Sequence, residues 1–152
     1  MFEDSFATVY NKCKLMLYDK ALDDSGKGKD ALTVQEVISM EIITALGEPT
    51  INEFLSFAHL SASNAAYRIR QLEKRGYVVR EQDAKDRREY HLKATDKYAK
   101  EYGAITDYVR LVGSRVRERF PAEDVAKLDE MLTVMGEDLM PEVAARLREH
   151  RD

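Results

Sequence analysis

The apolar residues of this 152-residue chain recur mainly three or four positions apart, the spacing of helices with one apolar face. Over residues 2–22 the apolar stripe is wider than one core-facing side of a helix requires. The polar, glycine-bearing residues 23–30 then predict a loop. The same apolar spacing predicts later helices over residues 33–46, 51–58, 62–75, 96–119 and 122–148. Pro141 interrupts the last of these patterns and should kink or split that helix.

Residues 77–94 do not follow the helical spacing. Residues 77–82 begin with aromatic and β-branched side chains, as strands commonly do, and residues 89–94 alternate between polar and apolar. The charged residues 83–88 between these two segments predict a turn. We therefore expect a mainly α fold with one small β-hairpin.

Side chains that can cap helices indicate where three of the helices begin. Thr33 with Glu36, and Thr50 with Glu53, have the spacing of a capping box, in which two side chains satisfy backbone N–H groups reciprocally. Thr95 is expected to cap the helix that follows it.

The helix over residues 62–75 has two different faces. Ser61 can cap its N-terminus, and Gly76 stands where a left-handed residue would end it. One face is apolar and consists of Ala65, Ile69 and Leu72. The opposite face has hydrogen-bonding groups and no carboxylate, and it consists of Ser63, Tyr67, Arg70 and Lys74, flanked by Asn64 and Ala66.

A short turn joins this helix to the one over residues 51–58, which is the helix-turn-helix arrangement, and the hairpin that follows makes it winged. Such a helix enters the major groove of DNA, and the wing reaches a minor groove or the phosphates. The net charge of the chain is −4, but residues 61–97 hold 10 basic and 6 acidic side chains. We call residues 61–97 the reading head. Because this segment is basic and the rest of the chain is acidic, the protein would bind DNA in one orientation.

Three short motifs carry a resemblance to a known family: residues 72–80 (LEKRGYVVR), residues 86–88 (DRR) and residues 94–95 (AT). Together they resemble the MarR family of bacterial transcription regulators. That family has a leucine, basic residues, a glycine and an aliphatic pair, then a wing with Asp-x-Arg and a Leu-Thr helix start. Two positions depart from the pattern, because Ala94 replaces the usual leucine and Tyr98 stands where a glycine is common. The resemblance implies a winged helix-turn-helix fold with long N- and C-terminal dimerisation helices.

The helix geometry and the resemblance together give the candidate DNA-binding residues. They are Ser61, Ser63, Asn64, Tyr67, Arg68, Arg70, Lys74, Lys85, Asp86, Arg87 and Arg88. Residues on the outer face of the helix should meet bases or phosphates in the major groove, whereas Arg68 and Lys74 should meet phosphates. Matched to the family, Asp86 and Arg88 are the Asp and Arg of the wing. Across a tight turn, Asp86 can aim the Arg88 guanidinium.

The first and last helices have more apolar surface than the DNA-reading part of the chain can cover. The simplest explanation is that a partner chain buries the rest of this surface. We therefore expect one domain of 152 residues that forms a homodimer. Residues 33–97 would form the winged helix-turn-helix, and residues 1–30 and 98–152 the dimerisation helices. The expected function is a ligand-responsive repressor of transcription, which binds a pseudo-palindromic operator in double-stranded DNA.

The sequence has no pattern for catalysis, a cofactor or a metal. Residues 26–29 have neither the length nor the spacing of a nucleotide-binding glycine loop, and no Ser/His/Asp set can be nominated. His59, His91 and His150 have no metal-ligand spacing. We therefore expect no enzyme activity, no cofactor and no metal site.

The chain is expected to be cytoplasmic. Cys13 is the single cysteine, so no internal disulfide can form, and this fits a reducing cytosol. No run of about 18 apolar residues is present to span a membrane. The N-terminus lacks a basic region followed by an apolar run, which a secretory signal would require.

Three alternatives remain open. Cys13 could sense peroxide, as one cysteine in the first helix does in some relatives of the resembled family, although a free cysteine is more often a small buried apolar residue. The winged helix could bind a protein instead of DNA. Five tyrosines could either line an effector pocket or simply pack in the core: Tyr10, Tyr18, Tyr98, Tyr102 and Tyr108.

Overall fold

The computed structural model describes residues 1–23, 28 and 31–148. Its elements in order are α1 (Phe2–Leu22), α2 (Val34–Ala45), α3 (Ile51–Phe57), α4 (Ala62–Lys74), β1 (Val78–Gln82), β2 (Tyr90–Ala94), α5 (Asp96–Tyr102), α6 (Ala104–Arg119), α7 (Ala122–Glu137) and α8 (Glu142–Arg148). The fold is mainly helical with one antiparallel hairpin, so the predicted fold class is confirmed. Most of the loop expected at residues 23–30 lies outside the described residues.

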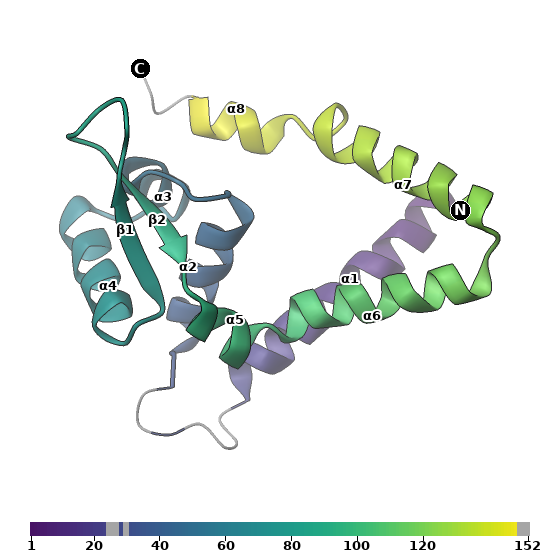
Figure 1. Ribbon diagram of the computed structural model, residues 1–152, viewed down its shortest axis with the longest axis horizontal. Helices are drawn as coiled ribbons and strands as arrows, with labels where there is room; N and C mark the ends of the chain where they lie inside the picture. Colours follow the sequence, from purple (N-terminus) through teal and green to yellow (C-terminus); the bar gives the residue numbers. More distant parts are fainter. Residues whose placement is uncertain (24–27, 29–30, 149–152) are drawn as a thin grey trace. The chain divides into compact units, whose positions relative to one another are not determined.

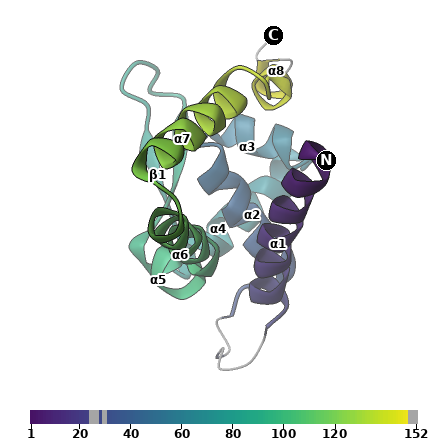
Figure 2. The ribbon, with the colours of Figure 1, turned by 90° about the vertical axis from the view of Figure 1, so that its right-hand side faces the viewer.

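The chain divides into two compact units, residues 1–104 and 105–152. In the first unit, α4 packs beside β1, whereas α2 and α3 pack beside β2 (Figure 1). The strands pair from Val78 opposite Ala94 to Gln82 opposite Tyr90. The C-terminal part of α1 lies beside α2 (Figure 2), while its N-terminal part extends away from α2, α3 and α4 (Figure 1).

One core holds the first unit together, and every element of that unit contributes to it. Its buried apolar side chains are Ala21, Leu32, Val37, Met40, Ile43, Phe54, Ile69, Leu72, Tyr77, Val78, Leu92, Tyr98 and Tyr102. The apolar face predicted for α4 is confirmed, because its three residues are at most 2% exposed. Burial of each large aliphatic side chain stabilises the fold by about 1.5–3 kcal/mol.

The spacing of the apolar residues in α2 does not by itself decide which face is buried. Val37 is buried, but Val34 and Ile38 are 40% and 48% exposed. Met40 and Ile43 are buried instead. Apolar residues surround most of this helix, so their spacing does not decide which of them face the core.

The expected single helix over residues 96–119 is wrong, because the chain leaves the helical path at Gly103, between α5 and α6. Glycine is a poor helix former because ordering its backbone costs more entropy than for other residues. The side chains of α5 are also held by the core: the Leu32 N–H donates to the Tyr102 hydroxyl at 2.9 Å, and the Tyr98 hydroxyl donates to Glu41. Residues 98–102, expected among the dimerisation helices, thus contribute to the winged-helix core.

The C-terminal helix is split as Pro141 predicted. α7 ends at Glu137, and α8 begins at Glu142, directly after the proline. A proline lacks the backbone N–H that would continue the helical hydrogen bonds, and its ring clashes with the preceding turn. None of the side chains assessed for burial in α6 and α7 is buried in the single chain.

Both predicted capping boxes are confirmed. Thr33 and Glu36 bond reciprocally at the start of α2, as Thr50 and Glu53 do at the start of α3. Thr95 is the N-cap residue of α5, as predicted, but its side chain makes no capping hydrogen bond; its hydroxyl instead donates to the Gly76 carbonyl at 2.6 Å. This bond ties the end of β2 to the end of α4.

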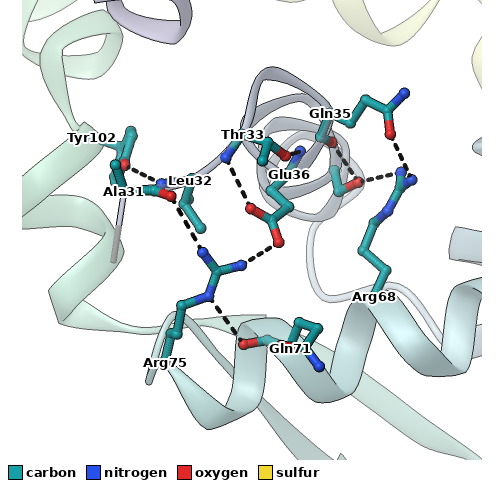
Figure 3. A network of polar contacts seen from close by, with 10 residues as sticks. Ala31, Leu32, Thr33, Gln35, Glu36, Arg68, Gln71, Arg75 and Tyr102 are labelled. Atoms are coloured by element: carbon teal, nitrogen blue, oxygen red, sulfur yellow. Dashed lines mark hydrogen bonds and ion pairs between the residues drawn. The ribbon is translucent and has the colours of Figure 1, made fainter. Parts of the chain in front are cut away.

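Polar contacts fix the end of α4 against the start of α2. The Arg75 guanidinium donates to the Glu36 carboxylate, to the Ala31 carbonyl at 3.4 Å and to the Gln71 carbonyl at 3.3 Å (Figure 3). The Arg75 and Glu36 side chains are only 19% and 15% exposed. Burial raises the pKa of Glu36, but the Thr33 N–H and the Arg75 guanidinium outweigh burial and lower the pKa overall. Glu36 therefore remains ionised at neutral pH.

We expect Arg75→Met to lower the free energy of unfolding by about 2–4 kcal/mol, because it leaves a largely buried carboxylate without its cation. The matched variant is Arg80→Met, which removes a more exposed partner of Glu73. That loss should be below about 1 kcal/mol. Urea unfolding of the parent and both variants measures the difference, and equal losses would contradict the structural role assigned to Arg75.

Candidate nucleic-acid interface

α4 presents its polar face outward because its apolar face is buried in the core. The Ser61 hydroxyl caps the helix by accepting from the Asn64 N–H at 3.2 Å. Gly76 ends this segment with a φ of +78°, a conformation that glycine adopts without steric cost. The outward side chains are those predicted, and they are Ser63, Asn64, Tyr67, Arg70 and Lys74.

Arg68 is placed differently from the other cations of α4. Its guanidinium donates to the Ser39 hydroxyl at 3.1 Å and to the Gln35 side-chain oxygen at 3.2 Å, both on α2 (Figure 3). Ser39 is itself buried and donates to the Gln35 carbonyl at 2.8 Å. Arg68 therefore ties the reading helix to α2 within the fold, and it is less free than Arg70 to turn toward a phosphate.

The wing turn is ordered by the carboxylate of Asp83, a residue that was not among the predicted site residues. Its Oδ1 accepts from the Lys85 and Asp86 N–H groups at 2.7 and 2.8 Å. The Gln82 side chain donates to the Arg87 carbonyl at 2.7 Å and closes the turn from the other side. The sequence signal for this role was the position of Asp83 at the start of a charged turn. The short side chain of aspartate commonly accepts from backbone N–H groups two or three positions on.

The expected pair of Asp86 and Arg88 is present. The Arg88 Nε and Nη2 groups donate to the two Asp86 carboxylate oxygens at 3.2 and 3.3 Å, and the Arg88 N–H donates at 3.0 Å. The Arg88 guanidinium, followed by the Arg88 N–H, lowers the pKa of Asp86. The Arg88 side chain is nevertheless 91% exposed, so the carboxylate holds the guanidinium without removing it from solvent.

Three further contacts at or near the wing were not predicted from the sequence. His91 on β2 lies 2.8 Å from Asp83 and 2.8 Å from the Glu48 carbonyl oxygen, and Arg80 on β1 donates to Glu73 of α4 at 2.7 Å. These partners are 7 to 43 residues apart in sequence. No local pattern brings such residues together.

The tyrosines proposed for an effector pocket have different environments. Tyr98 and Tyr102 stack on each other in the core, each with an edge contact to Tyr77. Burial, followed by the Glu41 carboxylate, raises the pKa of Tyr98. Tyr10 and Tyr18 on α1 are about half exposed. Core packing therefore accounts for the two buried tyrosines.

The described part of the chain adds no support for a redox site at Cys13 or for a metal site. Cys13 is a free, half-buried thiol on α1, and the Lys14 ammonium lies 4.6 Å from the centre of the Tyr10 ring. Among the described residues, no three His, Cys, Asp or Glu side chains are grouped to hold a metal ion, and His150 lies outside them. No helix in this part of the chain has the length and apolar character needed to cross a membrane.

Residues 32–90 match the model of the MarR family. A comparison with curated proteins found no match. The matched stretch contains α2, α3, α4, β1 and the wing turn, including Asp86 and Arg88. The predicted resemblance is thus confirmed over these residues, and members of this family are transcription regulators and not enzymes.

Solved structures with this fold cover nearly the whole chain. A mutant of MepR from a multidrug-resistant clinical isolate of S. aureus is 17% identical, with a TM-score of 0.61, covering 92% of this chain and 98% of that one. The transcriptional regulator Tm0710 from Thermotoga maritima is 22% identical, with a TM-score of 0.56 and coverages of 91% and 96%. FabT from Streptococcus pneumoniae, solved in complex with DNA, is 16% identical, with a TM-score of 0.53 and coverages of 91% and 97%. At these identities the likeness establishes the fold.

Proposed function

We propose that this chain, whose residues 32–90 match the model of the MarR family, is a homodimeric transcription repressor of the cytoplasm. It binds a pseudo-palindromic operator in double-stranded DNA and releases it when a small-molecule effector binds. The structure of FabT in complex with DNA supports this proposal by analogy, since FabT shares the fold.

The observation that carries the proposal is the outer face of α4. This face presents hydroxyl, amide, phenol and cationic groups without an exposed carboxylate, although the chain as a whole is acidic. Such groups read base edges in the major groove and bind phosphates. A winged helix that binds a protein needs a face without carboxylates only when its partner is acidic, whereas every DNA duplex is negatively charged, so DNA is the better-supported partner.

The wing supplies the second set of contacts. Lys85, Arg87 and Arg88 lie on the exposed turn, and Asp86 holds the Arg88 guanidinium in one orientation. A guanidinium held in this way loses less side-chain freedom on binding. The minor groove is strongly negative where it is narrow, which favours an inserted arginine.

Dimerisation is supported by apolar side chains left exposed in the single chain. On α1 they include Phe2, Phe6, Val9, Tyr10 and Leu15, and on α7 Leu128, Met131, Leu132 and Val134, each at least 40% exposed. Exposed apolar surface on this scale marks an interaction site. Two-fold symmetry would place two reading helices on one face of the DNA, with half-sites about 10 bp apart.

Selection of preferred DNA from a random pool tests the function directly. We expect the parent to enrich a sequence with a dyad and half-sites about one helical turn apart. Tyr67→Ala and Arg70→Ala should change the preferred base at one position of each half-site, at a cost of about 1–3 kcal/mol, because these residues can reach base edges. Lys74→Ala, one turn further along α4, should weaken all sequences alike. A pool that shows no enrichment would instead favour the protein-binding alternative.

The arginine of the wing should contribute directly to DNA affinity. We expect Arg88→Ala to lower DNA affinity and to reduce the slope of log affinity against log salt by up to about 1.8 for a dimer, at ~0.9 for each lost phosphate contact. Asp86→Ala should also weaken binding, although it removes negative charge near the DNA. Fluorescence anisotropy over a series of salt concentrations measures both effects. Tighter binding by Asp86→Ala would show that the wing is only a basic patch.

The exposed apolar residues of α7 should hold the dimer together. We expect Leu132→Asp on α7 to raise the dimer dissociation constant at least about tenfold, because a charge buried at an apolar interface is costly. Lys127→Asp places the same carboxylate on the same helix at a polar position. It should leave the constant within about threefold, although its change in net charge is larger. Sedimentation equilibrium measures both, and a parent that remains a folded monomer at micromolar concentration would refute the dimer.

A further inference from the structure

A histidine at the base of the wing joins two segments that are distant in sequence. The Nδ1 atom of His91 lies 2.8 Å from the backbone carbonyl oxygen of Glu48, in the turn between α2 and α3. Its Nε2 atom lies 2.8 Å from Oδ2 of Asp83, at the start of the wing turn. The same two segments meet through the backbone, since Leu92 N–H donates to the Pro49 carbonyl at 2.8 Å.

The two contacts of His91 require a doubly protonated ring. A carbonyl oxygen accepts hydrogen bonds only, and so does an ionised carboxylate. Asp83 is ionised in this setting, because the Asp86 N–H, His91 and the Lys85 N–H lower its pKa to about 2. A neutral imidazole has one N–H, so it can satisfy only one of these two acceptors. Deprotonation of His91 therefore breaks one side of the bridge.

The carboxylate that binds His91 also builds the wing. Asp83 uses Oδ2 for His91 and Oδ1 for the N–H groups of Lys85 and Asp86. Asp86 in turn holds the Arg88 guanidinium. A continuous chain of hydrogen bonds therefore runs from the turn between α2 and α3 to the exposed arginine of the wing.

We propose that His91 is a pH-sensitive positioning residue for DNA binding: its imidazolium ties the wing to the turn between α2 and α3, and its deprotonation loosens the wing and weakens binding. This inference rests on the proposed DNA-binding function and adds a regulation to it. His91 need not touch DNA, because it acts through Asp83 and Asp86.

The charged groups around His91 favour its protonated form. Asp83 faces it from the wing turn, Glu81 is its partner in the strand register, and Glu48 and Glu53 approach from the turn and from α3. Lys93, two residues on along β2, is the cation of this group, with its ammonium 3.6 Å from Glu48 and 3.7 Å from Glu81. Asp83, followed by the Glu48 carbonyl, raises the pKa of His91 above its ordinary value of 6.5.

The direction of the pH effect follows from that raised pKa. Because His91 binds its proton more tightly in the folded wing than in the unfolded chain, the bridge stabilises the wing fully below pH 6.5. The stabilisation is lost as the pH rises through the higher pKa of the folded protein. DNA affinity should therefore fall as the pH rises through this window.

DNA affinity at constant salt between about pH 5 and pH 8 tests the inference, since only histidine among unperturbed side chains titrates there. We expect the parent to lose about threefold to tenfold in affinity as the pH rises, the size expected for one hydrogen bond to a charged group near the surface. His91→Gln should bind at the weaker level throughout, with a flat profile. Asp83→Asn should lose the fall in affinity with rising pH, because its side-chain N–H can donate to the neutral His91 ring. Asn at position 83 keeps an oxygen acceptor for the wing N–H groups, so it preserves the turn. His59→Asn is the matched control and should keep the slope of the parent.

Histidine ring-proton NMR on the DNA-free full chain gives an independent readout. We expect His91 to titrate above pH 6.5 in the parent and at a lower pH in Asp83→Asn. A parent pH slope retained in His91→Gln, or a His91 titration unaffected by Asp83→Asn, would overturn the inference while leaving DNA binding intact. Absence of DNA binding by the parent at every pH would overturn the proposed function and, with it, the inference.

Discussion

Burial of one face of α4 is the constraint on which the rest of the reading head depends. Ala65, Ile69 and Leu72 lie under the helix with no more than 2% of their surface exposed. A rotation of the helix by one residue, about 100°, would expose these side chains and bury polar ones. Several kcal/mol of apolar burial therefore fixes which side chains face outward, and the proposed reading face is a consequence of the core.

Polar contacts then refine the orientation that the core sets. Arg75 and Arg68 both reach from α4 to α2, one to Glu36 and the other to Ser39 and Gln35. An arginine fork can satisfy several oxygen acceptors at once, so each side chain restricts sliding of one helix along the other. Two of the arginines in this region, Arg68 and Arg75, therefore bind groups of the protein itself. Ion pairs of Arg80, Arg88 and Lys93 with carboxylates reduce the free charge further.

The wing is ordered by side chains because its backbone has little support of its own. A two-stranded hairpin is only marginally stable in water, and most of β1 is exposed. Asp83, Asp86 and His91 supply the missing order through hydrogen bonds to backbone groups and to one another. The order of the wing thus depends on polar hydrogen bonds, whereas that of the core depends on apolar burial.

The sequence by itself determined the order of elements, the two capping boxes, the buried face of α4 and the pair of Asp86 and Arg88, because each depends on residues within a few positions of one another. It did not predict the break between α5 and α6 at Gly103. Tyr98 and Tyr102 of α5 are buried against elements that are far away in the chain, and no local pattern shows this packing. Nor did the sequence decide the buried face of α2, where apolar residues occur on most sides. Only the tertiary structure joined His91 to Glu48 and Arg68 to Gln35, across 43 and 33 positions, because packing and not sequence spacing brings such partners within bonding distance.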